Sequence, residues 1–126
     1  MNARCELIKK IINEHKYKIV EEDEDFIIIR YQMNTIHITS SEDDNFVTIL
    51  LPRFTDVTND NYADVLMRCN KLNENMKQAK VYIMDDIIIA TAEFYYMDES
   101  DLSFQISTGL NSVIAAKVNY RKLEKQ

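Results

Sequence analysis

The apolar residues of this 126-residue chain change their spacing partway along the sequence. Between Asn59 and Lys77 they recur every three to four residues, which is the period of an amphipathic helix. From Lys80 onward they alternate or run continuously on both sides of Asp85-Asp86, as they do in strands. This stretch therefore predicts a helix followed at once by a β-hairpin.

The same periodicities predict three helices and six strands in the whole chain. The predicted helices are Asn2–Lys16, Asn59–Lys77 and Asp101–Lys125. The predicted strands are Tyr17–Val20, Phe26–Tyr31, Thr35–Thr39, Phe46–Leu51, Lys80–Met84 and Ile87–Tyr96. The connections within the first four strands are too short for parallel crossovers, so these strands form an antiparallel meander. The prediction is an α+β fold, in the order α-β-β-β-β-α-β-β-α, as a single domain over residues 1–126.

Three features bear on how these elements pack. The apolar stripe of the central helix predicts a buried face, made of Tyr62, Val65, Leu66, Cys69, Leu72 and Met76. Replacing Leu66 by alanine is expected to cost about 2–5 kcal/mol if this side chain lies in the core. Phe26–Tyr31 is apolar on both faces, which predicts a central strand. Gly109, inside the last helix, either lets another backbone approach or has no special role.

Charge and cysteine content exclude several classes of function. The formal net charge of −6 and the pI near 4.9 disfavour nucleic acid and anionic membranes as partners. No apolar run reaches the ~18 residues of a membrane span, and the first residues do not resemble a signal peptide. A cytoplasmic protein is therefore expected. Cys5 and Cys69 are expected to be buried free thiols, although a disulfide between them is an alternative.

Familiar catalytic motifs are missing. A single glycine excludes phosphate-binding loops, and two histidines, His15 and His37, exclude the common zinc signatures. No cofactor and no metal site are predicted. Three acidic clusters, Glu21–Asp25, Glu42–Asp44 and Asp85–Asp86, are interpreted as solvated turns, with divalent-cation binding as the alternative. A ligand-binding or metal-dependent enzyme would have to use acidic side chains such as Glu93 or Asp85.

Two groups of residues are candidates for contact with a protein. Tyr82, Phe94, Tyr95 and Tyr96 lie in the predicted hairpin, and alternation cannot place three consecutive rings on one face. The last helix, a second subunit or a partner must then cover the exposed rings. Asn70 and Asn73 either bond the connection at residues 78–80 through their amides or contact a partner.

The segments Cys69-Asn70-Lys71-Leu72-Asn73 and Lys80–Ala90 resemble the YbjN family, as does the order of elements over nearly the whole chain. The fold of that family is similar to that of type III secretion chaperones. The resemblance implies a regulator of sensory transduction, and the fold relatives bind extended protein segments, often as homodimers. The sequence as a whole therefore predicts a non-enzymatic, chaperone-like or regulatory protein-binding module.

Overall fold

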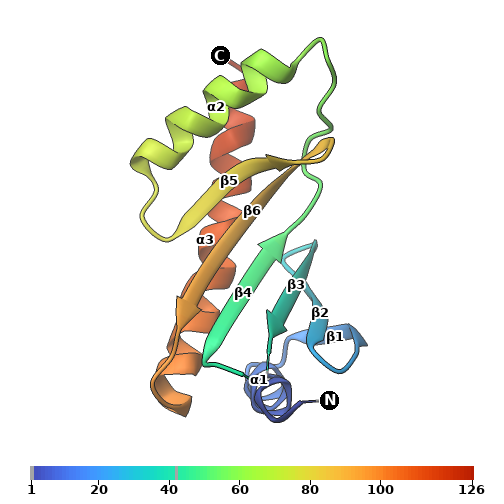
Figure 1. Cartoon of the computed structure of the whole chain (residues 1–126), viewed down its shortest axis with the longest axis vertical. Coiled ribbons are helices and arrows are strands. Elements are labelled where there is room, and N and C mark those ends of the chain that lie inside the picture. Colours follow the sequence, from blue (N-terminus) through green and yellow to red (C-terminus); the bar gives the residue numbers. More distant parts are fainter. Residues whose placement is uncertain (1, 42) are drawn as a thin grey trace.

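The structure is a computed structural model that describes residues 2–41 and 43–126. It contains three helices and six strands in the predicted order (Figure 1). The helices are α1 (Ala3–Glu14), α2 (Tyr62–Asn75) and α3 (Glu99–Glu124). The strands are β1 (Lys18–Glu22), β2 (Phe26–Tyr31), β3 (Asn34–Ser40), β4 (Phe46–Leu51), β5 (Ala79–Met84) and β6 (Ile87–Tyr95).

The six strands form one antiparallel sheet in the order β1-β2-β3-β4-β6-β5. The α+β class and the order of elements predicted from the sequence are confirmed. β2 is not central, however, because β3 and β4 take the middle of the sheet. The face of β2 that includes Ile28 is only half-buried, because no helix formed by the described residues covers that side of the sheet.

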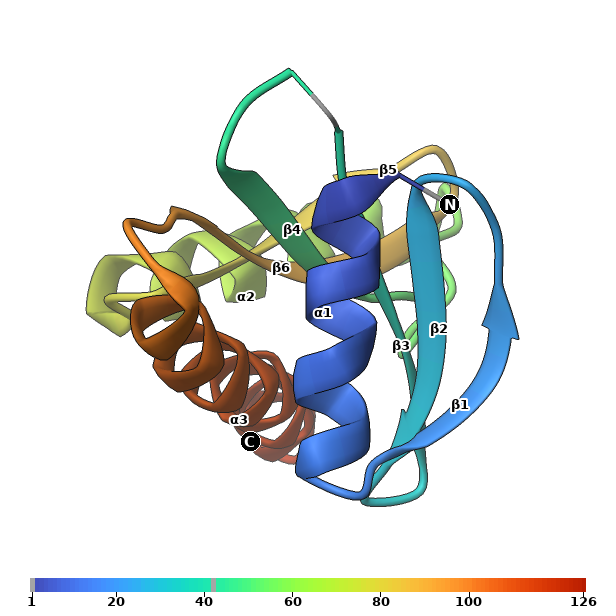
Figure 2. The same cartoon turned by 90° about the horizontal axis from the view of Figure 1, so that it is seen from below.

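One face of the sheet packs against α1 and α3, which lie on the same side of it (Figure 2). Alternate residues of β2, β3 and β4 point to this side and are fully buried, among them Ile27, Ile36 and Ile49. They join Ile8 and Ile11 of α1, and Leu102 and Leu110 of α3, in one apolar cluster. The opposite face carries polar residues such as Thr39 and Glu93, which are exposed. Among the described residues, no helix is long and apolar enough to cross a bilayer.

α2 begins three residues later than the sequence predicts. Thr58 and Asn61 exchange hydrogen bonds between side chain and backbone, and the amide of Asn61 donates to the carbonyl of Asp56. These bonds hold residues 58–61 as a turn, so that the helix starts at Tyr62. The last helix, predicted from Asp101, begins two residues earlier at Glu99, because the Asp98 side chain caps it by accepting a 2.8 Å bond from the Asp101 amide.

The buried face of α2 is narrower than the apolar stripe. Val65, Cys69 and Leu72 are buried, but Tyr62 is 48% exposed and Leu66 is 44% exposed. The expectation that Leu66 lies in the core is therefore wrong. α2 packs against β5 and α3 together, and the arc that these two neighbours cover is centred on Val65 and Cys69. Val118 of α3 is likewise 47% exposed, outside the buried face of that helix.

Gly109 marks the place where α3 crosses the sheet. A Cβ atom on this residue would lie 2.6 Å from Cδ1 of Ile49 on β4 and 3.7 Å from Cβ of Ala92 on β6. Close approach is thus the correct interpretation of this glycine, but the approaching group is a side chain rather than a backbone. The bare backbone of α3 makes room for Ile49 in the core.

Candidate protein-contact surface

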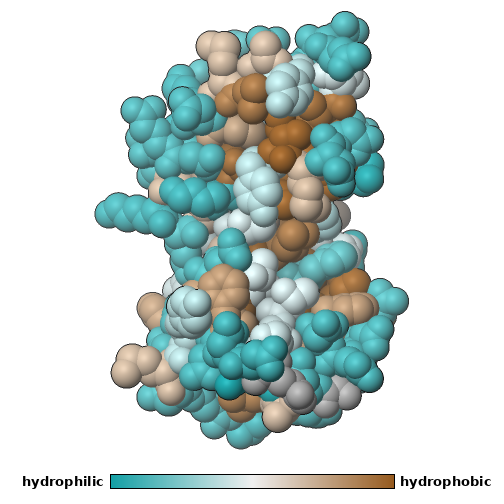
Figure 3. Space-filling view, in the orientation of Figure 1, coloured by the Kyte–Doolittle hydropathy of each residue, from teal (hydrophilic) through white to brown (hydrophobic). Residues whose placement is uncertain are grey.

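α2 and the β5–β6 hairpin together present exposed apolar side chains on one side of the molecule. On α2, Tyr62 and Leu66 are one turn apart, and exposed Asn70 continues the same line. On β5, Tyr82 and Met84 are each 42% exposed. We call these five residues the α2–hairpin surface. Figure 3 shows apolar side chains gathered over this half of the molecule, with hydrophilic side chains beside them.

The structure brings together only two of the six contact residues predicted from the sequence on this surface, Asn70 and Tyr82. Tyr62 and Leu66 were predicted to lie on the buried face of the helix, and Met84 was not predicted as a contact residue. The available signal for these residues was the width of the apolar stripe on α2, which exceeds what one packing side can bury. Met84 had a signal too, since it directly precedes the exposed turn at Asp85-Asp86.

Asn73 has a different place, beneath the surface at the edge of the sheet. Its amide donates a 2.8 Å bond to the Val81 carbonyl and accepts a 2.8 Å bond from the Val81 amide. Both backbone groups of Val81 point away from β6, so Asn73 pairs with them as a neighbouring strand would. The side chain also ties α2 to the edge strand β5, which helps to hold the α2–hairpin surface in shape.

The three consecutive aromatic residues at the end of the hairpin are divided between the two faces of the sheet. Phe94 and Tyr96 are 8% and 7% exposed and belong to the apolar cluster, because they face the helices. The Tyr96 hydroxyl accepts a 2.9 Å bond from Arg4 of α1. Tyr95 is 67% exposed on the other face and packs against Phe46, with 4.9 Å between the ring centroids. In this conformation, Tyr95 alone of the three is available to a partner.

Tyr95 lies far from the α2–hairpin surface. Tyr82 pairs with Ile89 across the hairpin, and Tyr95 follows Ile89 by six residues along β6. At roughly 3.3 Å per residue, the separation along the strand is about 20 Å. The predicted aromatic set is therefore not one surface.

The acidic side chains proposed for an enzyme also lie apart. Asp85 is at the exposed hairpin turn, where its φ of 57° is the left-handed conformation expected for it, and Glu93 accepts a 3.2 Å bond from Thr48 near the far end of β6. Within residues 2–41 and 43–126, no three histidine, cysteine or acidic side chains gather as metal ligands would. Glu42, in one of the acidic clusters, lies outside the described residues.

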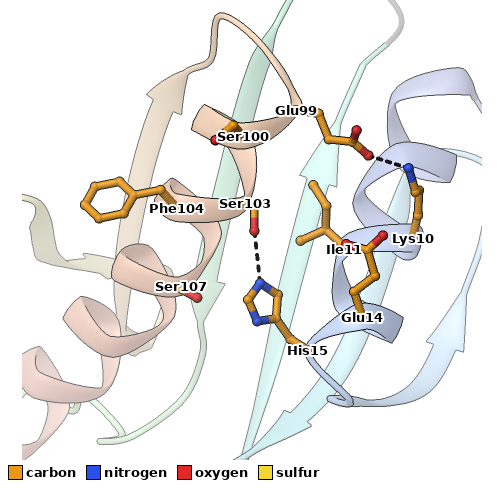
Figure 4. Close-up of a pocket in the computed structure, with 9 residues that line it drawn as sticks. All are labelled: Lys10, Ile11, Glu14, His15, Glu99, Ser100, Ser103, Phe104 and Ser107. Carbon is orange, nitrogen blue, oxygen red and sulfur yellow. Dashed lines mark hydrogen bonds and ion pairs between the residues drawn. The ribbon is translucent and has the colours of Figure 1, made fainter.

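Away from the α2–hairpin surface, an open groove of about 550 Å³ lies between α1 and α3 (Figure 4). Two polar contacts cross it: Lys10 to Glu99 at 2.7 Å, and His15 Nε2 to Ser103 Oγ at 3.0 Å. The histidine and serine resemble part of a nucleophilic site. Ser103, however, lies inside the regular helix α3, whose backbone amides are engaged in the helix and cannot stabilise an oxyanion. His15 is the C-cap of α1.

The sequence matches the family model TY-Chap1, described as T3SS (YopN, CesT) and YbjN peptide-binding chaperone 1, over residues 5–99. This family binds peptides, so the non-enzymatic protein binding predicted from the sequence is confirmed at the level of the family. Neither this match nor the geometry of the described residues supports the enzyme alternative. A search of curated proteins finds no match.

Two crystal structures share the fold. YbjN from E. coli superposes with a TM-score of 0.75 at 8% sequence identity, over 95% of this chain and 93% of YbjN. The Yersinia pestis type III secretion chaperone SycH, in complex with a stable fragment of YscM2, superposes with a TM-score of 0.63 at 12% identity, over 94% of this chain and 99% of SycH. At these identities the likeness establishes the fold alone. Because the family model covers most of its length, the chain belongs to the T3SS and YbjN peptide-binding chaperone family.

Proposed function

We propose that this protein binds a segment of a partner protein on the α2–hairpin surface and catalyses no reaction. The observation that carries the proposal is the exposure of Tyr62, Leu66, Tyr82 and Met84 on two neighbouring elements. Exposed apolar side chains that gather in this way are characteristic of protein-contact sites. The peptide binding of the family supports the same conclusion.

The surface is preformed, which favours binding. Val65, Cys69 and Leu72 anchor α2 in the core, and Asn73 fixes it to β5 through two hydrogen bonds. The exposed side chains therefore project from rigid elements, and a partner does not have to order them. Each large apolar side chain that a partner fully buries contributes roughly 1.5–3 kcal/mol.

A homodimer through the same surface is the second candidate, and the distribution of charge favours it. Asp60 and Asp64 lie at the start of α2, whereas Lys71, Lys77 and Lys80 lie near its end. Two copies with antiparallel α2 helices would place the acidic end of each against the basic end of the other. We also propose a cytoplasmic location, which the two free cysteines support.

The test begins with proteins that co-purify with the chain from its own cells, followed by direct binding of peptides from the identified partner. Leu66→Asp and Tyr82→Asp should each weaken binding at least about tenfold, because a carboxylate in an apolar contact is costly to desolvate. Met33→Asp is the matched control, since Met33 is 91% exposed on the turn between β2 and β3. Equal binding by all the variants would show that the partner contacts another surface.

Sizing measurements separate the two candidates. A homodimer has twice the 14.8 kDa mass of one chain, and Leu66→Asp should return it to the mass of a single chain. A wild-type protein with the mass of one chain at all concentrations would exclude the dimer and leave the surface free for a partner segment.

A further inference from the structure

One end of the α2–hairpin surface is strongly acidic. The segments 52–67 and 82–90 border this end and carry five aspartates and one arginine. Arg68 follows on α2, and Arg121 of α3 donates a 3.0 Å bond to the Phe54 carbonyl, so acidic side chains are in excess here but not alone. The aspartates are Asp56, Asp60, Asp64, Asp85 and Asp86, and all five are exposed.

Hydrogen bonds bring these two segments together. The Val57 amide donates a 2.7 Å bond to the Asp86 carbonyl, and Asp56 forms an isolated β-bridge with Ile87. The side-chain amide of Asn61, directly before α2, donates a 3.1 Å bond to the Asp56 carbonyl. The start of α2 and the hairpin turn are therefore neighbours in space, although more than twenty residues separate them in the sequence.

Tyr62 and Met84 lie at the border between these carboxylates and the apolar surface. Tyr62 follows Asn61 at the start of α2, and Met84 directly precedes Asp85. Arg53 forms an ion pair with Asp56 at 3.4 Å and lies on the exposed outside of the segment. Asp64 lies one turn before Arg68 and interacts electrostatically with its guanidinium. The carboxylates of Asp60, Asp85 and Asp86 have no salt bridge among the described residues and lie within two residues of Tyr62 or Met84 in the sequence.

We propose that the partner segment is amphipathic and carries lysine or arginine in the part that lies against Tyr62 and Met84. This inference rests on the proposed function, since it specifies the partner of the same surface. Its physical basis is charge complementarity: cations opposite these carboxylates speed association and set the orientation of the bound segment. Like charges at the same place would repel the carboxylates and disfavour an acidic segment.

The charges at the opposite end of the α2–hairpin surface support the same orientation of the bound partner segment. Lys80 caps the end of α2, with its Nζ 3.4 Å from the Asn73 carbonyl and 3.3 Å from that of Met76. Lys71 and Lys77 are exposed nearby. Among residues 70–80, three lysines outnumber the single acid, Glu74, so the side-chain charge changes from mainly acidic to mainly basic along the surface. The basic part of a partner is thereby directed to the hairpin turn.

The test uses the full chain and synthetic peptides with leucines at either helical or alternating spacing. Each peptide is made in two forms, with lysine or with glutamate at its polar positions. For the spacing that binds better, we expect the lysine form to bind at least about tenfold more tightly than the glutamate form at low salt. The reason is that a few exposed ion pairs would each increase the affinity by a small factor. Added salt should reduce this preference because it screens exposed charges.

Two variants with the same change in net charge separate the acidic end from the overall negative field. Asp60→Lys/Asp86→Lys should abolish the preference for lysine. Glu21→Lys/Glu24→Lys, at the far edge of the sheet around β1, should retain it. Equal loss in both variants would overturn the inference, because it would mean that net charge alone attracts the peptide.

The remaining outcomes distinguish this inference from the proposed function. Binding of both forms with equal affinity would overturn the charge preference and leave the apolar contact intact. Binding of neither form, by a protein with the mass of two chains, would overturn both in favour of a second copy on this surface.

Discussion

Leu66 and Leu72 belong to the same apolar stripe of α2 but have opposite surroundings. Leu72 is 8% exposed and packs in the core, whereas Leu66 is 44% exposed. Spacing along the helix shows that both residues lie on one broad side. It does not show which part of that side the neighbouring elements cover.

The two leucines give a matched pair of substitutions. Leu72→Ala should lower the free energy of unfolding by about 2–4 kcal/mol, since it removes buried methyl groups and leaves a cavity. Leu66→Ala should cost less than about 1 kcal/mol, because nearly half of this residue is already exposed to water and no closed cavity is left. Urea denaturation monitored by circular dichroism measures both. A larger loss for Leu66 than for Leu72 would mean that α2 packs with a different side toward the sheet.

At the scale of elements, the two edge strands of the sheet, β5 and β1, are protected from pairing with another chain in different ways. β5 is covered by α2, and Asn73 satisfies the outward backbone groups of Val81. β1 is only five residues long, carries Lys18, and has an irregularity between Ile19 and Glu21. These are the usual means by which proteins keep an edge strand from pairing with another chain. The exposed apolar side chains of α2 and the hairpin are therefore a better candidate for recognition than either edge.

The contribution of Asn73 can be measured against that of Asn70. Asn73→Ala should destabilise the protein by about 1–3 kcal/mol, because it leaves two backbone groups of Val81 without partners. Faster hydrogen exchange at the Val81 amide should accompany this loss. Asn70→Ala, an exposed substitution on the same helix, should change stability by less than about 0.5 kcal/mol. If Asn73→Ala leaves both stability and exchange unchanged, the amide has no structural role.

The crossing of α3 over β4 gives another test at this scale. Gly109→Ala places a methyl group against Cδ1 of buried Ile49, so overpacking should outweigh the gain of about 1 kcal/mol in helix propensity. Ile49→Val removes Cδ1, and in that background Gly109→Ala should become neutral or stabilising. A double-mutant cycle measures the coupling. Additive effects would mean that the two residues do not meet.

For the molecule as a whole, one apolar cluster joins all three helices to the sheet. Cys69 of α2 lies in this cluster, whereas Cys5 of α1 is buried outside it, and both thiols are free. Burial raises the pKa of the Cys5 thiol above its ordinary value and raises the pKa of the Cys69 thiol to about 11. Both thiols are therefore protonated near pH 8 and are shielded from reagents until the chain opens.

If residues 1–126 form a single domain, the whole chain should unfold as one unit. Thiol labelling measures whether it does. In the single-cysteine variants Cys5→Ala and Cys69→Ala, the remaining thiol should become reactive over the same range of urea concentration. Because each substitution can itself change stability, the labelling of each variant is compared with the unfolding of the same variant measured by circular dichroism. Labelling of Cys5 at clearly lower urea would show that α1 opens before the rest of the molecule.

Sequence reasoning succeeded where the determining interactions are local. The period of apolar residues and the turn at Asp85-Asp86 depend on neighbours a few residues away, so the elements and their order were predictable. Tyr95 and the pair Phe94 and Tyr96 show the limit of such reasoning. Alternation required them to lie on opposite faces, but it could not show which face the helices cover.

By itself, the sequence determined the α+β class, the order of the elements, the absence of familiar catalytic motifs and a resemblance to the correct family. Only the tertiary structure decided which sides of α2 and the hairpin stay exposed, and that Asp56 and Val57 lie beside Asp86 and Ile87. The physical reason is that burial and proximity between distant segments depend on how the elements pack against one another. The pattern within any one element does not contain that information.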